Sequence, residues 1–111
     1  MNFAQRAARN EEVFRDVNER IEEGAERHRV EAPLRFHCEC GRASCVETID
    51  VRPAEYESVV RERFHFMLIP GHEDPEIEQV VERRDSFLIV EKVGDAREQI
   101  DSDHPQQRHR G

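Results

Sequence analysis

A chain of 111 residues has room for one domain with a small core. Charged residues make up 38% of the chain, hydrophobic residues make up 36%, and the formal net charge at pH 7 is -8. This acidic balance argues against binding to nucleic acid or to an anionic membrane surface, because contacts with phosphate depend on clustered Lys and Arg. We therefore expect protein partners, no nucleic acid and no membrane, and a chain that is a monomer or a homodimer.

The sequence also predicts a cytoplasmic location. No apolar run approaches the roughly 20 residues that a membrane-spanning helix needs, and residues 1–6 lack the apolar segment of a signal peptide. Thiols stay reduced in the cytoplasm, and three cysteines cannot all pair within one chain. The cysteines are therefore interpreted as metal ligands and not as disulfide partners.

Residues 1–30 are predicted to form an amphipathic helix, from about Phe3 to Ala25, and a linker. Mostly small and apolar residues recur there at alternating spacings of four and three: Phe3, Ala7, Asn10, Phe14, Val17, Ile21 and Gly24. This seam has the period of a helix face, and Gly24 suits its end. A helix that starts at Asn10, with this side chain as its N-cap, fits equally well. The helix either packs on its own domain or docks on a protein partner or a second copy, through about residues 10–23.

Alternating apolar and polar residues after the linker predict strands at 34–38 and 46–51, joined as a hairpin. Pro53 suits the first position of a short helix that runs to about residue 63. A strand at 64–69 ends at the following Pro-Gly pair. Two further apolar segments, 77–81 and 87–93, predict a second hairpin, although residues 75–81 also fit two helical turns.

Together these elements predict an α+β fold. It comprises a long N-terminal helix, a small antiparallel β-sheet with one short helix, and a knuckle held by a metal ion, and the domain spans residues 31–95. The apolar pattern ends beyond Gly94, and residues 96–111 are predicted to be a disordered tail. The segment from Leu34 to Val93 has about 60 residues, which is near the lower limit for a core without a further cross-link.

All three cysteines lie within eight residues, in a segment from Cys38 to Cys45 that we call the knuckle. Cys38 and Cys40 share one face of a strand, and Cys45 returns after a short turn. A Pro-Gly pair directly before His72 fits a type II turn, which would hold this side chain at a fixed angle. Three thiolates and one imidazole suit a closed tetrahedral zinc site, so we predict that Zn²⁺ is bound by Cys38, Cys40, Cys45 and His72.

The fourth ligand has two rivals, His37 and His65, but both lie within predicted strands. His37 directly adjoins Cys38 and is therefore expected on the opposite face. The simplest competing interpretation, three buried core cysteines beside a surface turn, conflicts with their clustering. The ligand set is also similar to that of the CDGSH-type iron–sulfur proteins, whose Cys-Asp-Gly-Ser-His run does not occur here.

Several motifs follow one another along the chain: a charged helix at 9–21, the knuckle, Glu55-Tyr56-Glu57, Pro70-Gly71-His72 and Val90-Glu91-Lys92. This pattern resembles an uncharacterised family of small bacterial proteins, over about residues 9–96. Members often have Thr before the short helix, whereas this chain has Arg52, which is a poor N-cap. The resemblance implies no activity.

No catalytic motif occurs in the sequence. The serines lack a Gly-x-Ser-x-Gly context, and the five glycines form no phosphate-binding loop. A site with three cysteines and one histidine also leaves no open position for water. We therefore predict a non-enzymatic zinc-stabilised domain that serves as a protein-interaction or regulatory module. The alternative is a thiol-based redox or metal sensor, in which oxidation of the Cys38/Cys40/Cys45 cluster ejects the ion.

Overall fold

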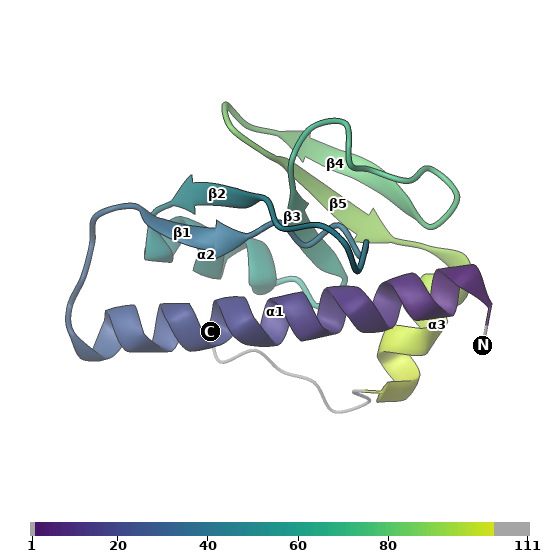
Figure 1. Ribbon diagram of the computed structural model, residues 1–111, viewed down its shortest axis with the longest axis horizontal. Coiled ribbons are helices and arrows are strands. Elements are labelled where there is room, and N and C mark those ends of the chain that lie inside the picture. The colour runs from purple at the N-terminus through teal and green to yellow at the C-terminus, as the bar shows by residue number, and fades with distance from the viewer. Residues whose placement is uncertain (1, 104–111) are drawn as a thin grey trace.

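The computed structural model describes residues 2–103, which form an α+β fold as the sequence predicts. Helix α1 runs along the length of the molecule beneath both sheets (Figure 1). The elements in chain order are α1 (Phe3–Arg27), β1 (Leu34–His37), β2 (Thr48–Val51), α2 (Pro53–Val60), β3 (His65–Leu68), β4 (Glu78–Arg83), β5 (Leu88–Lys92) and α3 (Gly94–Asp103).

The described strands form two antiparallel sheets, where the sequence suggested one. Strand β1 pairs with β2, while β3, β5 and β4 form a second sheet with β5 in the centre. Beyond β1, the amide of Glu39 donates to the carbonyl oxygen of Met67 in β3 at 2.8 Å. This bond joins the two sheets without extending either ladder, because the chain then turns into the knuckle.

Both predicted hairpins are present. The knuckle lies between β1 and β2, and β4 pairs with β5. The helical alternative for residues 75–81 is therefore wrong. Helix α2 begins at Pro53 as predicted but ends at Val60, and Arg52 makes no side-chain capping hydrogen bond.

The prediction of a disordered tail from residue 96 is wrong for residues 96–103. They belong to α3, whose Ala96 and Ile100 are buried, and α3 packs against α1. Two apolar residues in a polar segment are too sparse a pattern to predict a helix, and tertiary contact supplies the stability instead. The rest of the predicted tail, residues 104–111, lies outside the described residues.

Helix α1 begins at Phe3, as the sequence predicts, and ends two residues beyond the predicted end. It begins after Asn2, whose side chain forms a capping box with Gln5, so Asn10 is not its N-cap. It also passes Gly24 and continues to Arg27, into the predicted linker. The helix ends where the amide of His28 bonds back to the carbonyl oxygen of Gly24 at 3.1 Å.

The buried stripe of α1 is mostly one residue out of step with the predicted seam, of which only Ala7 is buried among the side chains that the structure describes. The other members of the stripe are Ala8, Glu11, Arg15, Asn18, Glu22 and Ala25. The spacing is that of a helix face, but most members are polar, so a search for apolar periodicity does not find it. Val17, which the sequence placed on the seam, is instead 46% exposed, and Val13, one turn before it, is 57% exposed. The side chain of Phe3 lies outside the described part of the chain.

Lys92, the only lysine of the chain, is fully buried between α1 and the second sheet. Its ammonium group forms ion pairs with Glu11 of α1 and Glu78 of β4. Burial raises the pKa of Glu11 to about 7, against the opposing charge of Lys92, and burial also lowers the pKa of Lys92. A proton on Glu11 leaves one positive and one negative charge, so that the buried group of three is neutral.

The raised pKa of Glu11 predicts that stability falls with rising pH. Between 4.5 and about 7 the folded carboxyl keeps its proton while the unfolded carboxyl releases it. The free energy of unfolding should therefore fall over this range, by up to ~1.4 kcal/mol per pH unit from this group.

Urea unfolding measured across this pH range checks the prediction. The variant Glu11→Gln, which imitates the protonated carboxyl, should lose this part of the slope, and the exposed control Glu62→Gln should keep it. Identical slopes for the wild type and Glu11→Gln would show that Glu11 does not titrate in this range.

Candidate metal centre

The structure brings the four predicted ligands together. One ligand atom from each of Cys38, Cys40, Cys45 and His72 lies within 4.8 Å of all the others. The Nδ1 atom of His72 lies 3.5 Å from Sγ of Cys38 and 3.9 Å from Sγ of Cys45. A tetrahedral zinc site with Zn–S bonds of about 2.3 Å has sulfur–sulfur edges of about 3.8 Å, so a small adjustment of side chains would complete the coordination.

The two rival histidines have other roles. The ring of His37 contacts the carbonyl oxygens of Cys38 and Cys45, at 2.5 and 3.0 Å, and it stacks on Phe14 of α1. His65 pairs with Glu91 across the second sheet at 3.0 Å. Neither histidine belongs to the Cys/His group that the described residues form.

The knuckle is shaped by a tight turn and by close contact with α1. The amide of Cys45 donates to the carbonyl oxygen of Arg42 at 2.9 Å, which closes the turn. Gly41 adopts a φ of +78°, and a Cβ there would lie 2.9 Å from the carbonyl oxygen of Ala7. Glycine is therefore required at this position both by the backbone conformation and by the approach of the helix.

His72 is held by the turn that the sequence predicts. The amide of His72 donates to the carbonyl oxygen of Ile69 at 3.0 Å, and Gly71 has the positive φ of a type II turn, +97°. Because Ile69 directly follows β3, this turn extends from the rigid second sheet. The turn therefore carries the imidazole to the three sulfur atoms of the knuckle.

Backbone amides surround the sulfur atoms. The amide of Ile69 donates to Sγ of Cys38 at 3.3 Å, and the backbone of Arg42 bonds to Cys40. The hydrogen bond between Cys38 and Cys40, followed by that from Arg42, lowers the pKa of Cys40, while the same bond to Cys40 raises the pKa of Cys38. Burial raises the pKa of Cys45 despite a backbone bond from Glu47. The cluster thus favours one thiolate, and metal binding would release the remaining thiol protons.

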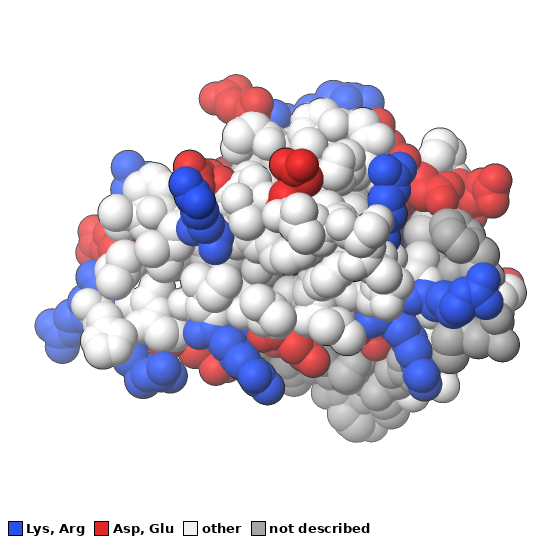
Figure 2. Space-filling model, viewed as in Figure 1, with Lys and Arg blue, Asp and Glu red and all other residues white. Residues whose placement is uncertain are grey.

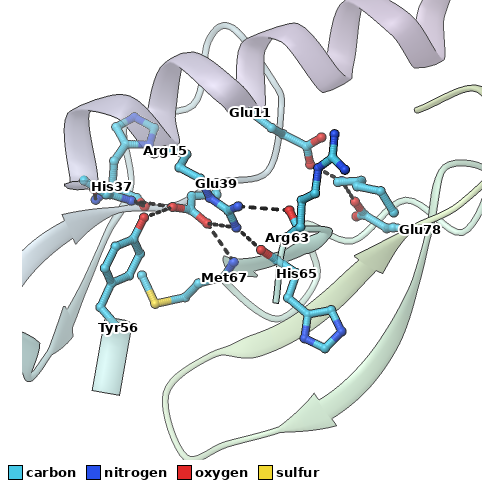
Figure 3. A network of polar contacts seen from close by, with 11 residues as sticks. Glu11, Arg15, His37, Glu39, Tyr56, Arg63, His65, Met67 and Glu78 are labelled. Atoms are coloured by element: carbon cyan, nitrogen blue, oxygen red, sulfur yellow. Dashed lines mark hydrogen bonds and ion pairs between the residues drawn. The ribbon is translucent and has the colours of Figure 1, made fainter. Parts of the chain in front are cut away.

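The residue between the first two cysteines, Glu39, is fully buried, and the alternation of faces turns it away from their sulfur atoms. Its carboxylate accepts hydrogen bonds from the Tyr56 hydroxyl at 2.7 Å, Asn18 Nδ2 at 3.0 Å and the Met67 amide at 2.9 Å (Figure 3). The guanidinium of Arg15 lies 3.9 Å away. The carboxylate therefore ties α1, α2 and β3 to the chain segment that carries Cys38 and Cys40.

Sequence reasoning missed this carboxylate and its partners. The available signals were the alternation of faces at Cys38-Glu39-Cys40, which turns Glu39 away from the sulfur atoms, and the helical spacing of Arg15 and Asn18. Polar residues with these spacings are usually exposed to solvent, so neither signal identifies a buried group before the tertiary contacts are known.

No protein-family model, no curated protein and no solved structure matches this chain. None of the helices among residues 2–103 is long and apolar enough to cross a membrane. The site is therefore interpreted from its own geometry.

The hydrogen bond between Tyr56 and Glu39 should contribute measurably to stability. Burial raises the pKa of Tyr56, so its hydroxyl stays protonated and donates to the carboxylate. Tyr56→Phe should lower the free energy of unfolding by about 2 kcal/mol, because the charged acceptor loses a buried donor.

Chemical denaturation of two variants checks this value. The control is Ser58→Ala in the same helix, which removes an exposed hydrogen bond of 2.6 Å from the Ser58 hydroxyl to the carbonyl oxygen of Glu55. This variant should change the free energy of unfolding by less than about 0.5 kcal/mol. Equal losses in the two variants would contradict the role given to Glu39.

Proposed function

We propose that the protein binds one Zn²⁺ through Cys38, Cys40, Cys45 and His72 and uses it as a structural cross-link. The observation that carries this proposal is the convergence of three sulfur atoms and one imidazole nitrogen within 4.8 Å. This donor set suits zinc in a closed tetrahedral site, and the surrounding amides offset the charge of the thiolates. The ion would join the knuckle to the turn after β3, two segments that are 27 residues apart at Cys45 and His72.

The proposed role is that of a non-enzymatic interaction or regulatory module in the cytoplasm. Four protein ligands fill the coordination sphere of zinc, so the ion would have no position for a reacting water. The proposed resemblance to the uncharacterised bacterial family agrees with this role but adds no activity to it.

The outer face of α1 is the surface proposed for a protein partner. Val13 and Val17 lie there one turn apart and are about half exposed. Figure 2 shows uncharged surface across the middle of the molecule and several basic side chains along its lower edge. The two valines would supply apolar contacts to a protein partner that docks on α1.

Metal analysis of the purified full-length protein, together with its visible spectrum, tests the proposal. We expect one zinc ion per chain and no visible absorption, because zinc has a filled d shell. Iron together with visible absorption would contradict the proposal and indicate an iron–sulfur centre at this site. A chain that binds no metal after incubation with zinc would contradict it.

Removal of one ligand tests the structural role of the ion. Cys40→Ser should abolish stoichiometric zinc binding and lower the melting temperature by more than about 10 °C, because structural zinc contributes on the order of 10 kcal/mol to small domains. Ser44→Ala, an exposed substitution in the same knuckle, is the control and should change neither quantity. An unchanged melting temperature for Cys40→Ser would rule out a structural ion.

A redox sensor is the second candidate, and the exposure of the site favours it. Cys45 is partly exposed, and its sulfur lies within 4.8 Å of those of Cys38 and Cys40. Hydrogen peroxide would oxidise two thiols to a disulfide and be reduced to two water molecules, which leaves too few ligands for zinc. Zinc release at low peroxide concentration, reversed by a thiol reductant, would support the sensor. Retention of zinc would support the structural module.

A further inference from the structure

The segment from His37 to Gly41 has two faces with different partners. The side chains of Cys38 and Cys40 lie beside those of Cys45 and His72, whereas residues 37, 39 and 41 contact α1. This alternation follows from the two-residue period of an extended chain. The conformation that brings the two sulfur atoms to a metal ion is therefore the same conformation that presents the contacts for α1.

The contacts between α1 and this segment are mainly hydrogen bonds. The side chain of Asn18 accepts from the amide of His37 at 2.7 Å and donates to its carbonyl oxygen at 2.8 Å, as a neighbouring strand would. Asn18 also donates to Glu39, and Asn10 donates to the carbonyl oxygen of Gly41 at 3.0 Å. Hydrogen bonds depend steeply on distance and angle, so this attachment requires a fixed backbone at residues 37–41.

The knuckle has little backbone pairing to fix that conformation by itself. The ladder of β1 and β2 ends at His37 and Thr48. Beyond it, the amides of Cys38 and Glu39 donate to the carbonyl oxygens of Glu47 and Met67, at 3.0 and 2.8 Å, and the amide of Cys45 closes its turn. A cross-link through the three sulfur atoms and His72 would add to these few bonds and supply part of the rigidity that the contacts with α1 require.

We propose that zinc binding and the docking of α1 are thermodynamically coupled, so that loss of the ion releases the helix segment from Asn10 to Asn18. This inference rests on the zinc site proposed above and adds a conformational switch to it. By linkage, the factor by which zinc strengthens the docking of α1 equals the factor by which docking strengthens zinc binding. Contacts that orient metal ligands commonly change metal affinity by about 10- to 100-fold.

Release of this segment uncovers a large polar and aromatic surface. Glu11 would leave Lys92, and Arg15 would leave the ring of Phe66, over which its guanidinium lies at 3.9 Å. The second sheet keeps the pairing of β5 with β3 and β4, and Lys92 of β5 keeps its ion pair with Glu78. The zinc-free form would thus retain a folded sheet and expose the inner face of α1.

Hydrogen exchange of the full-length chain, with zinc and with excess chelator, tests the release directly. We expect amides of residues 10–21 and 37–45 to lose protection by at least about 10-fold together on chelation, while amides of β5 stay protected. Unchanged protection of residues 10–21 after complete removal of zinc would overturn the coupling.

Zinc affinity measured by competition with a chromophoric chelator provides the reciprocal test. Asn18→Ala should weaken zinc binding by about 10-fold or more, and Asn10→Ala, which removes the single bond to Gly41, should weaken it less. Val17→Ala, on the exposed side of the same helix, is the control and should leave the affinity unchanged. Asn10→Ala keeps the test valid if Asn18→Ala fails to fold.

The outcomes separate this inference from the proposed function. Zinc binding with equal affinity in the wild type, Asn10→Ala and Asn18→Ala would overturn the coupling and leave the structural zinc site in place. A wild-type chain that binds no zinc would overturn both.

Discussion

Glu39 lies between two predicted metal ligands and its carboxylate is fully buried, so the surrounding elements have to supply it with donors. The donors come from three separate elements, at Asn18 in α1, Tyr56 in α2 and the Met67 amide in β3. A buried carboxylate without these partners would cost several kcal/mol, which fixes the relative positions of the three elements. The same constraint turns the sulfur atoms of Cys38 and Cys40 to the other side of the chain, where His72 meets them.

The polar stripe of α1 gives the molecule an unusual way of holding its longest helix. Buried ion pairs and hydrogen bonds are costly to desolvate, and they add less net stability than an apolar face of equal area. They are, however, demanding in geometry, so they specify one position of the helix and not several. A helix held in this way responds to small changes in its partners, which is why the shape of the knuckle matters to α1 as much as to the metal ligands.

The sequence predicted those parts of the fold that depend on local chemistry. Clustered cysteines, a Pro-Gly turn before His72 and alternating strands correctly predict that the four Cys and His side chains lie together and that both hairpins form. The prediction of the buried face of α1 was wrong because Glu11 and Arg15 are buried by partners that are distant in sequence. The spacing of these polar residues carries no apolar signal. The sequence did not predict α3 for a related reason, since its two buried side chains are buried through tertiary contact, including contact with α1.

X-ray absorption at the zinc edge of the full-length protein would distinguish a closed site of three cysteines and one histidine from any other, because it reports the identity and distance of the atoms bound to the ion. We expect three sulfur atoms at about 2.3 Å and one nitrogen atom at about 2.0 Å, with no oxygen ligand. In the Cys40→Ser variant, any zinc ion that remains bound should have one sulfur ligand fewer. A spectrum with two or fewer sulfur atoms in the wild type, or with an oxygen ligand, would contradict the closed site on which the account depends.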